Sequence, residues 1–245
     1  MDYNILIVNI FFLERGGNLS FFNQFKNMKN FLLFVLIILI YIIIIIIITF
    51  LDRTYIQTDS KIIDFLMKDY PNEVVQNYIE SQKKWWWISY AIIPVLIGIK
   101  VFLVAFCLNF IKLFDLPGLD KIEYKYFLTL ALVAEFVFII AGLYKFANFY
   151  WFDTDYSLPD LQTYYPLSLI NFKENISTEI WLAYPLQLSN VFELLYWGIL
   201  AYGIWEYADK KISFLKSLGT VAATYGVGLL FWAGTVTFLI LNAQY

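Results

Sequence analysis

The segment NFLLFVLIILIYIIIIIIITF, residues 30–50, decides the class of this protein. It carries no charge over a length sufficient to cross a bilayer, for which about 20 apolar residues are needed. The Ile42–Ile48 run contains no small residue for close helix packing, so we expect this helix to lie at the periphery of the protein. Lys26 and Lys29 precede the segment and no A-x-A-like cleavage site follows it, which favours an uncleaved signal anchor.

Residues 1–29 are expected to be an N-terminal cytosolic extension. Met28 opens the stretch MKNFLLF, which is typical of the start of an anchor, so both Met1 and Met28 remain open as the start.

The composition agrees with a membrane protein. Of the residues, 61% are hydrophobic and 15% are charged, whereas soluble domains are about 45–50% apolar and about 25% charged. The net charge of −3 does not suggest a nucleic-acid partner. The single cysteine, Cys107, excludes an internal disulfide, and the absence of histidine removes the commonest general base and metal ligand. We therefore expect no cofactor. The expected partner is the lipid bilayer, and other membrane-protein subunits are further candidates.

Five stretches are apolar enough to be spans. They are residues 30–50, 86–111, 127–149, 189–207 and 219–241. The predicted fold class is an all-α integral membrane protein with about five transmembrane helices. In this prediction, residues 86–245 form a four-helix membrane bundle that includes an outer loop at 150–188.

The distribution of Lys and Arg predicts the orientation. Expected inside are Arg15, Lys26, Lys29, Lys112, Lys121, Lys125, Lys210, Lys211 and Lys216. The loop 150–188 offers only Lys173 against several acids. This pattern predicts an N-terminus inside and a C-terminus outside, in a multi-pass protein of the bacterial inner (cell) membrane.

The outer loop 51–85 is expected to hold two short amphipathic helices on the membrane surface, with a partner-docking hairpin as the alternative. Asp59 or Ser60 would cap the first helix, and Pro71 would lie in the first turn of the second. KKWWW, residues 83–87, would then lie at the outer membrane boundary.

The loop 150–188 is expected to be an irregular, aromatic-rich cap. Asp153, Asp155 and Asp160 suggest a metal site, but a calcium loop would need further oxygen ligands and a central glycine. Asn175-Ile-Ser177 matches the glycosylation pattern.

Lys100 lies inside the apolar stretch PVLIGIKVFLVAF, residues 94–106, and Glu135 lies inside the next predicted span. A charge at the bilayer centre costs about 2.5–3.5 kcal/mol, so it normally faces the bundle interior and has a partner. Depths counted at ~1.5 Å per residue place the two side chains ~5 Å apart along antiparallel neighbours. We predict an intramembrane ion pair between them. Pro94 and Gly98 could break the helix nearby.

Glu193 and Asn190 are expected at a polar outer rim of the fourth predicted span, either as a pocket or as a helix cap. Glu206 is expected at the inner edge of that span, extending toward water. Small residues suited to close helix packing recur in the last two spans: Gly198, Ala201, Gly219, Ala222, Gly226, Ala233 and Gly234.

The segment NVFELLYWGILAYGIWEYADKKISFLKSLGTVAATYGVG, residues 190–228, resembles the last two spans of the Yip1-like family of small polytopic membrane proteins. The resemblance extends over residues 86–245, although the long first and third loops depart from the family's short connections. It implies a membrane scaffold or accessory role and carries over no catalytic residue.

The sequence therefore favours a non-enzymatic accessory or scaffold subunit of a membrane complex. Two alternatives stay open: a small solute or ion translocator that uses Lys100 and Glu135, and a membrane enzyme that acts on lipids through the acids of loop 150–188.

Overall fold

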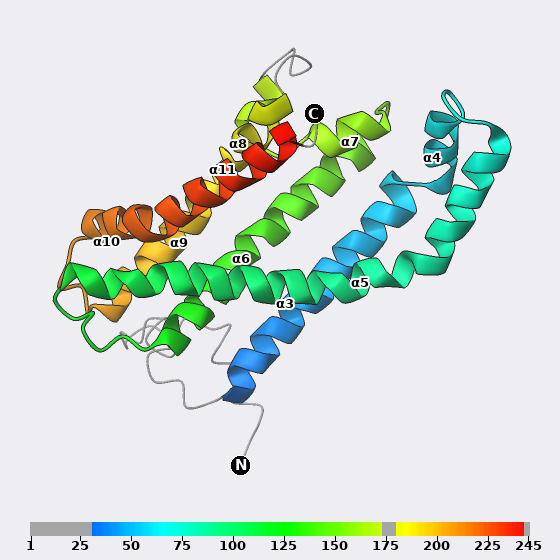
Figure 1. Cartoon of the computed structure of the whole chain (residues 1–245). Coiled ribbons are helices and arrows are strands. Elements are labelled where there is room, and N and C mark those ends of the chain that lie inside the picture. The colour runs from blue at the N-terminus through cyan, green and yellow to red at the C-terminus, as the bar shows by residue number, and fades with distance from the viewer. Residues whose placement is uncertain (1–30, 173–179, 243–245) are drawn as a thin grey trace.

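The computed structural model describes residues 31–172 and 180–242, and these residues form helices and connecting turns (Figure 1). The α-helices are α3 (Phe31–Leu51), α4 (Asp59–Leu66), α5 (Asn72–Asn109), α6 (Tyr124–Ala147), α7 (Leu158–Thr163), α8 (Ala183–Leu188), α9 (Val191–Tyr207), α10 (Phe214–Val221) and α11 (Val227–Asn242). Short 3₁₀ or π segments extend or join them: η1 (Asp52–Ile56), η2 (Phe110–Phe114), η3 (Asn148–Phe152), η4 (Leu169–Phe172), η6 (Ile180–Leu182) and η7 (Ala222–Gly226). No strand occurs within the described ranges, as predicted for an all-α protein.

Among the residues that the structure describes, four helices are long and apolar enough to cross a membrane. They span Phe34–Ile56, Asn72–Phe114, Tyr124–Phe152 and Phe214–Asn242. The remaining predicted span, 189–207, corresponds to α9, whose 17 residues extend ~26 Å at 1.5 Å per residue, slightly less than a ~30 Å hydrocarbon core. The described residues thus indicate a membrane-embedded protein with four helices of span length, and α9 is shorter than these.

The expectation of two separate amphipathic helices in residues 51–85 is wrong for the second of them. Only α4 is a short helix; the second merges with the next predicted span into the 38-residue helix α5, with Pro71 just before its first turn. At 1.5 Å per residue α5 is ~57 Å long, about twice the hydrocarbon thickness. Nor does Pro94 break it, because the helix continues on both sides.

The expected capping of α4 is also wrong. The residue that precedes α4 is Thr58, and its side chain makes no capping hydrogen bond, while Asp59 is already the first helical residue. An acid in the first turn still interacts favourably with the partial positive charge of the helix N-terminus.

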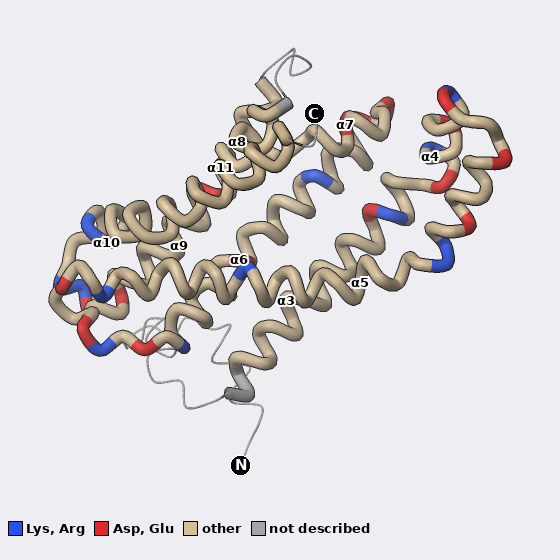
Figure 2. Tube along the Cα trace, viewed as in Figure 1, with Lys and Arg blue, Asp and Glu red and all other residues tan. Residues whose placement is uncertain are grey.

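The helix α6 occupies the middle of the molecule, with contacts to α3, α5 and α9 (Figure 1). The helix α5 crosses α3 and α6 obliquely, and the continuous run α10–η7–α11 packs beside α9 and α8. Within the described part of α3, Tyr41 is the buried residue, consistent with a peripheral first span. Figure 2 shows acidic and basic residues gathered at the helix ends, with few along the helices.

Close helix approach depends on three glycines. A Cβ atom added at Gly203 would overlap the Leu130 side chain of α6, one at Gly226 would lie 2.6 Å from the Trp197 ring, and one at Gly228 would lie 2.6 Å from Cys107 Sγ. By contrast, Gly198, Gly219 and Gly234 face open space. Among the small residues of the sequence pattern, Gly226 therefore has the expected role, whereas Gly203 and Gly228 were not recognised.

Gly203→Ala is expected to destabilise the protein. The added methyl group would overlap the Leu130 side chain, which is 1% exposed, and overpacking a core costs about 1–3 kcal/mol. The matched control is Gly198→Ala in the same helix, where the added methyl group meets nothing and helix propensity improves. Thermal unfolding in detergent should show a lower Tm for Gly203→Ala only; equal Tm values would contradict the close packing of α9 on α6.

Candidate functional site

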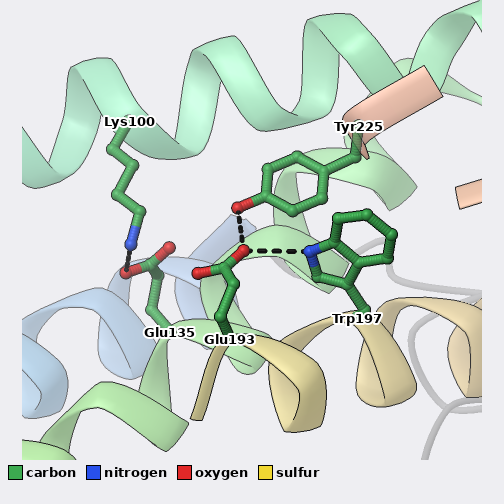
Figure 3. Close-up of polar contacts among 5 residues, drawn as sticks. All are labelled: Lys100, Glu135, Glu193, Trp197 and Tyr225. Atoms are coloured by element: carbon green, nitrogen blue, oxygen red, sulfur yellow. Dashed lines mark hydrogen bonds and ion pairs between the residues drawn. The ribbon is translucent and has the colours of Figure 1, made fainter. Parts of the chain in front are cut away.

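The structure brings Lys100 of α5 and Glu135 of α6 together. Lys100 Nζ lies 2.9 Å from Glu135 Oε2, a hydrogen-bonded ion pair (Figure 3). The sequence predicted that these two helices are neighbours, and α5 does contact α6, which it crosses obliquely in Figure 1. The predicted partners meet.

The two partners are buried unequally. The side chain of Glu135 is 2% exposed, while that of Lys100 is 43% exposed. The ammonium also lies over the Phe138 ring, 3.8 Å from its centroid, and 5.4 Å from that of Tyr196. Aromatic faces attract cations most strongly where water is excluded, so these rings add to the stabilisation of the ammonium.

Glu193 belongs to the same cluster, and its carboxyl group lies next to that of Glu135 (Figure 3). The Glu193 Oε1 atom accepts hydrogen bonds from Tyr225 Oη at 2.7 Å and from Trp197 Nε1 at 3.0 Å (Figure 3). The residue is 7% exposed, so its carboxyl group lies in the interior of the protein. Its position at the outer rim of the membrane stays a prediction. The sequence placed this residue near the membrane surface but did not reveal that α9 packs it against α6 and η7.

Asn190 is the N-cap of α9. Its Oδ1 atom accepts a hydrogen bond from the Glu193 backbone N–H at 2.8 Å, and its Nδ2 atom donates to the Gln187 carbonyl at 2.8 Å. It is 5% exposed because the chain around Ser168 pairs with it. Of the two interpretations left open for Asn190, helix capping is the one observed.

Two buried oxygen atoms of the cluster lack a partner among the described residues. They are Glu135 Oε1 and the hydroxyl of Tyr196, whose side chain is fully buried. The hydroxyls of Tyr196 and Tyr41 both lie near the Glu135 carboxylate. Polar groups from α3, α5, α6, α9 and η7 thus converge on one place. The tyrosines were not singled out from the sequence, because at helical spacing an aromatic residue looks like ordinary core.

Glu206 also differs from expectation. It is 4% exposed, and its Oε1 atom lies 3.3 Å from Lys210 Nζ. The side chain therefore points into the protein at the end of α9 instead of extending toward water.

Asp153, Asp155 and Asp160 do not form a metal site. No group of three potential metal ligands is found among residues 31–172 and 180–242. Asp160 instead accepts hydrogen bonds from the Ser157 backbone N–H at 2.8 Å and from its hydroxyl at 2.6 Å, a capping interaction at the start of α7. These hydrogen bonds hold the pKa of the Asp160 carboxyl below its usual value.

The loop is also more ordered than an irregular cap. It contains α7 and α8, and Lys145 Nζ at the end of α6 donates to the Leu161 carbonyl at 2.6 Å. The possible glycosylation site Asn175-Ile-Ser177 lies outside the described residues.

Comparison of the chain with protein-family models, with curated proteins and with solved structures finds no match. The resemblance to the Yip1-like family therefore stays a prediction.

Breaking the ion pair from either side is expected to destabilise the protein, but by different amounts. Removing one partner of a buried pair costs about 3–5 kcal/mol. Lys100→Met leaves a carboxylate that is 2% exposed without its cation, whereas Glu135→Leu leaves an ammonium that still lies over the Phe138 ring, 3.8 Å from its centroid. Lys100→Met should therefore lower the Tm in detergent more than Glu135→Leu does.

The double variant Lys100→Met/Glu135→Leu should recover much of the loss, because it removes both desolvation costs. Lys112→Met, at an exposed lysine beyond the end of α5, is the matched control and should leave the Tm unchanged. Additive losses in the double variant would show that the two charges do not stabilise each other.

Proposed function

We propose that this protein is a non-enzymatic, multi-span membrane protein that serves as an accessory or scaffold subunit of a membrane complex. The observation that supports the proposal is the use of its buried ionisable groups. Lys100 and Glu135 join α5 to α6, and Glu193 joins α9 to η7 through Tyr225. These contacts fix helices to one another, which is a structural use of charge and requires no chemistry on a substrate.

A translocator is the second candidate, and two observations favour it. The Lys100 side chain is 43% exposed, and the adjacent Glu135 Oε1 and Tyr196 Oη lack a partner among the described residues. Buried polar atoms are normally satisfied by protein or by ordered water. Water or a small solute that passes Lys100 would supply the missing hydrogen bonds.

Reconstitution distinguishes the two functions. The full chain is reconstituted into proteoliposomes that contain a pH-sensitive dye, and a pH gradient or membrane potential is imposed. If the protein is a scaffold, the proton flux should not exceed that of empty liposomes. It should also co-purify from mild detergent with a partner at fixed stoichiometry. Flux that exceeds that of empty liposomes and is lost in the stable Lys100→Met/Glu135→Leu variant would instead establish translocation.

The proposed orientation places the N-terminus inside, the C-terminus outside, and α9 as a fifth span of a bacterial inner-membrane protein. With Cys107→Ala as background, single cysteines at the exposed positions Asp120 and Asp155 report on opposite sides. A membrane-impermeant maleimide should label Asp155→Cys in intact cells and Asp120→Cys only after permeabilisation. The reverse labelling pattern would show that the orientation is the opposite of the proposed one. Labelling of both positions from the same side would show that no span lies between them.

A further inference from the structure

A second polar site lies away from the charge cluster, where α3 ends beside α4 and α5. A cavity of about 340 Å³ opens there between aromatic residues, Phe50, Trp86 and Tyr90, and polar ones, which include Arg53, Thr58 and Asp59. Its size falls at the lower end of the range of small-molecule sites, about 300–1,000 Å³.

The position of the cavity in the fold corresponds to a membrane boundary. Phe50 and Arg53 lie in the last turns of the first apolar span, and charged residues first gather at that end of α3 (Figure 2). Trp86 belongs to the run of three tryptophans in α5, and tryptophan side chains favour the level of the lipid headgroups. The cavity is therefore placed where a lipid presents its polar group.

The cavity wall carries one cation, Arg53, and one anion, Asp59. Asp59 is paired, since its Oδ2 atom lies 3.1 Å from Lys83 Nζ. Arg53 is half-buried and makes no ion pair with any residue that the structure describes. Asp59 is thus engaged by Lys83, and the Arg53 guanidinium stays available to a ligand in the cavity.

Two further donors are available beside Arg53. The Trp86 side chain is 48% exposed, and its indole N–H has no hydrogen-bond partner within the described ranges. The Tyr90 hydroxyl is buried and likewise lacks one there. Unpaired donors around an unpaired cation are complementary to an anion with several acceptor oxygens.

We propose that this cavity binds the phosphate group of a membrane phospholipid. Arg53 binds the phosphate oxygens, because the planar guanidinium fits phosphate with two parallel hydrogen bonds. Trp86 donates its indole N–H to a further oxygen. The acyl chains extend along α3 and α5, where Phe50, Ile47 and Ile92 are about half exposed.

Non-specific extension of Arg53 toward the headgroup layer is the alternative, since long basic side chains behave in this way without a defined site. The two interpretations predict different effects of a substitution at Trp86. Such a substitution should weaken lipid binding only if one lipid is held in the cavity. Arg53→Gln and Trp86→Phe test the site, and Lys68→Gln is the matched control, because it removes an exposed positive charge of the same loop outside the cavity wall.

The experiment is native mass spectrometry of the delipidated full chain, titrated separately with dioleoyl phosphatidylglycerol, dioleoyl phosphatidylethanolamine, dioleoylglycerol and glycerol 3-phosphate. Both phospholipids should bind at one tight site and the other two compounds should not. Arg53→Gln should weaken this binding about tenfold, the effect of one charge-assisted hydrogen bond. Trp86→Phe should weaken it by a smaller factor, and Lys68→Gln should leave it unchanged.

Equal binding by Arg53→Gln and Lys68→Gln, or binding of dioleoylglycerol as tight as that of the phospholipids, would overturn the proposal. Tight binding of glycerol 3-phosphate would assign the cavity to a water-soluble phosphate ester and overturn the lipid assignment. Should Arg53→Gln fail to fold, Trp86→Phe decides, and full retention of phospholipid by that variant overturns the site.

Discussion

The ion pair between Lys100 and Glu135 is the contact on which the arrangement of the helices depends. Helices in a bilayer gain little from burying apolar surface against one another, so packing and polar contacts decide how they associate. A carboxylate that is 2% exposed requires a cation within reach, and Lys100 is the cation that the structure supplies. The ion pair therefore restricts the crossing point of α5 and α6 to positions that keep these two side chains together.

The rest of the cluster follows from the same requirement. Glu193 adds a second carboxylate close to the first, and two neutral donors, Tyr225 and Trp197, share one of its oxygens. Its position in the first turn of α9 also places its charge at the favourable end of the helix. One ammonium and two carboxyl groups can therefore lie together, because aromatic residues supply the remaining hydrogen bonds and cation–π contacts.

Close packing at two glycines also holds the helices together. The carbonyl of Gly203 accepts a hydrogen bond from Tyr126 at 2.7 Å, and its missing side chain admits Leu130. At Gly226, the absence of a side chain admits the Trp197 ring, which then reaches Glu193. Packing at a glycine and hydrogen bonding in the cluster are thus coupled through one tryptophan.

The sequence by itself determined the class of protein, the all-helical fold and the partners of the ion pair. Long uncharged segments have few alternatives to a membrane-spanning helix, and a charge within one of them needs an opposite charge on a neighbour. Only the tertiary structure decided that α5 continues from Asn72 through Pro94, that Glu193 is buried in the cluster, and that Gly203 admits Leu130 while Gly198 faces open space. These features depend on which face of each helix meets its neighbour. In helices that are apolar on all sides, the sequence pattern does not distinguish one face from another.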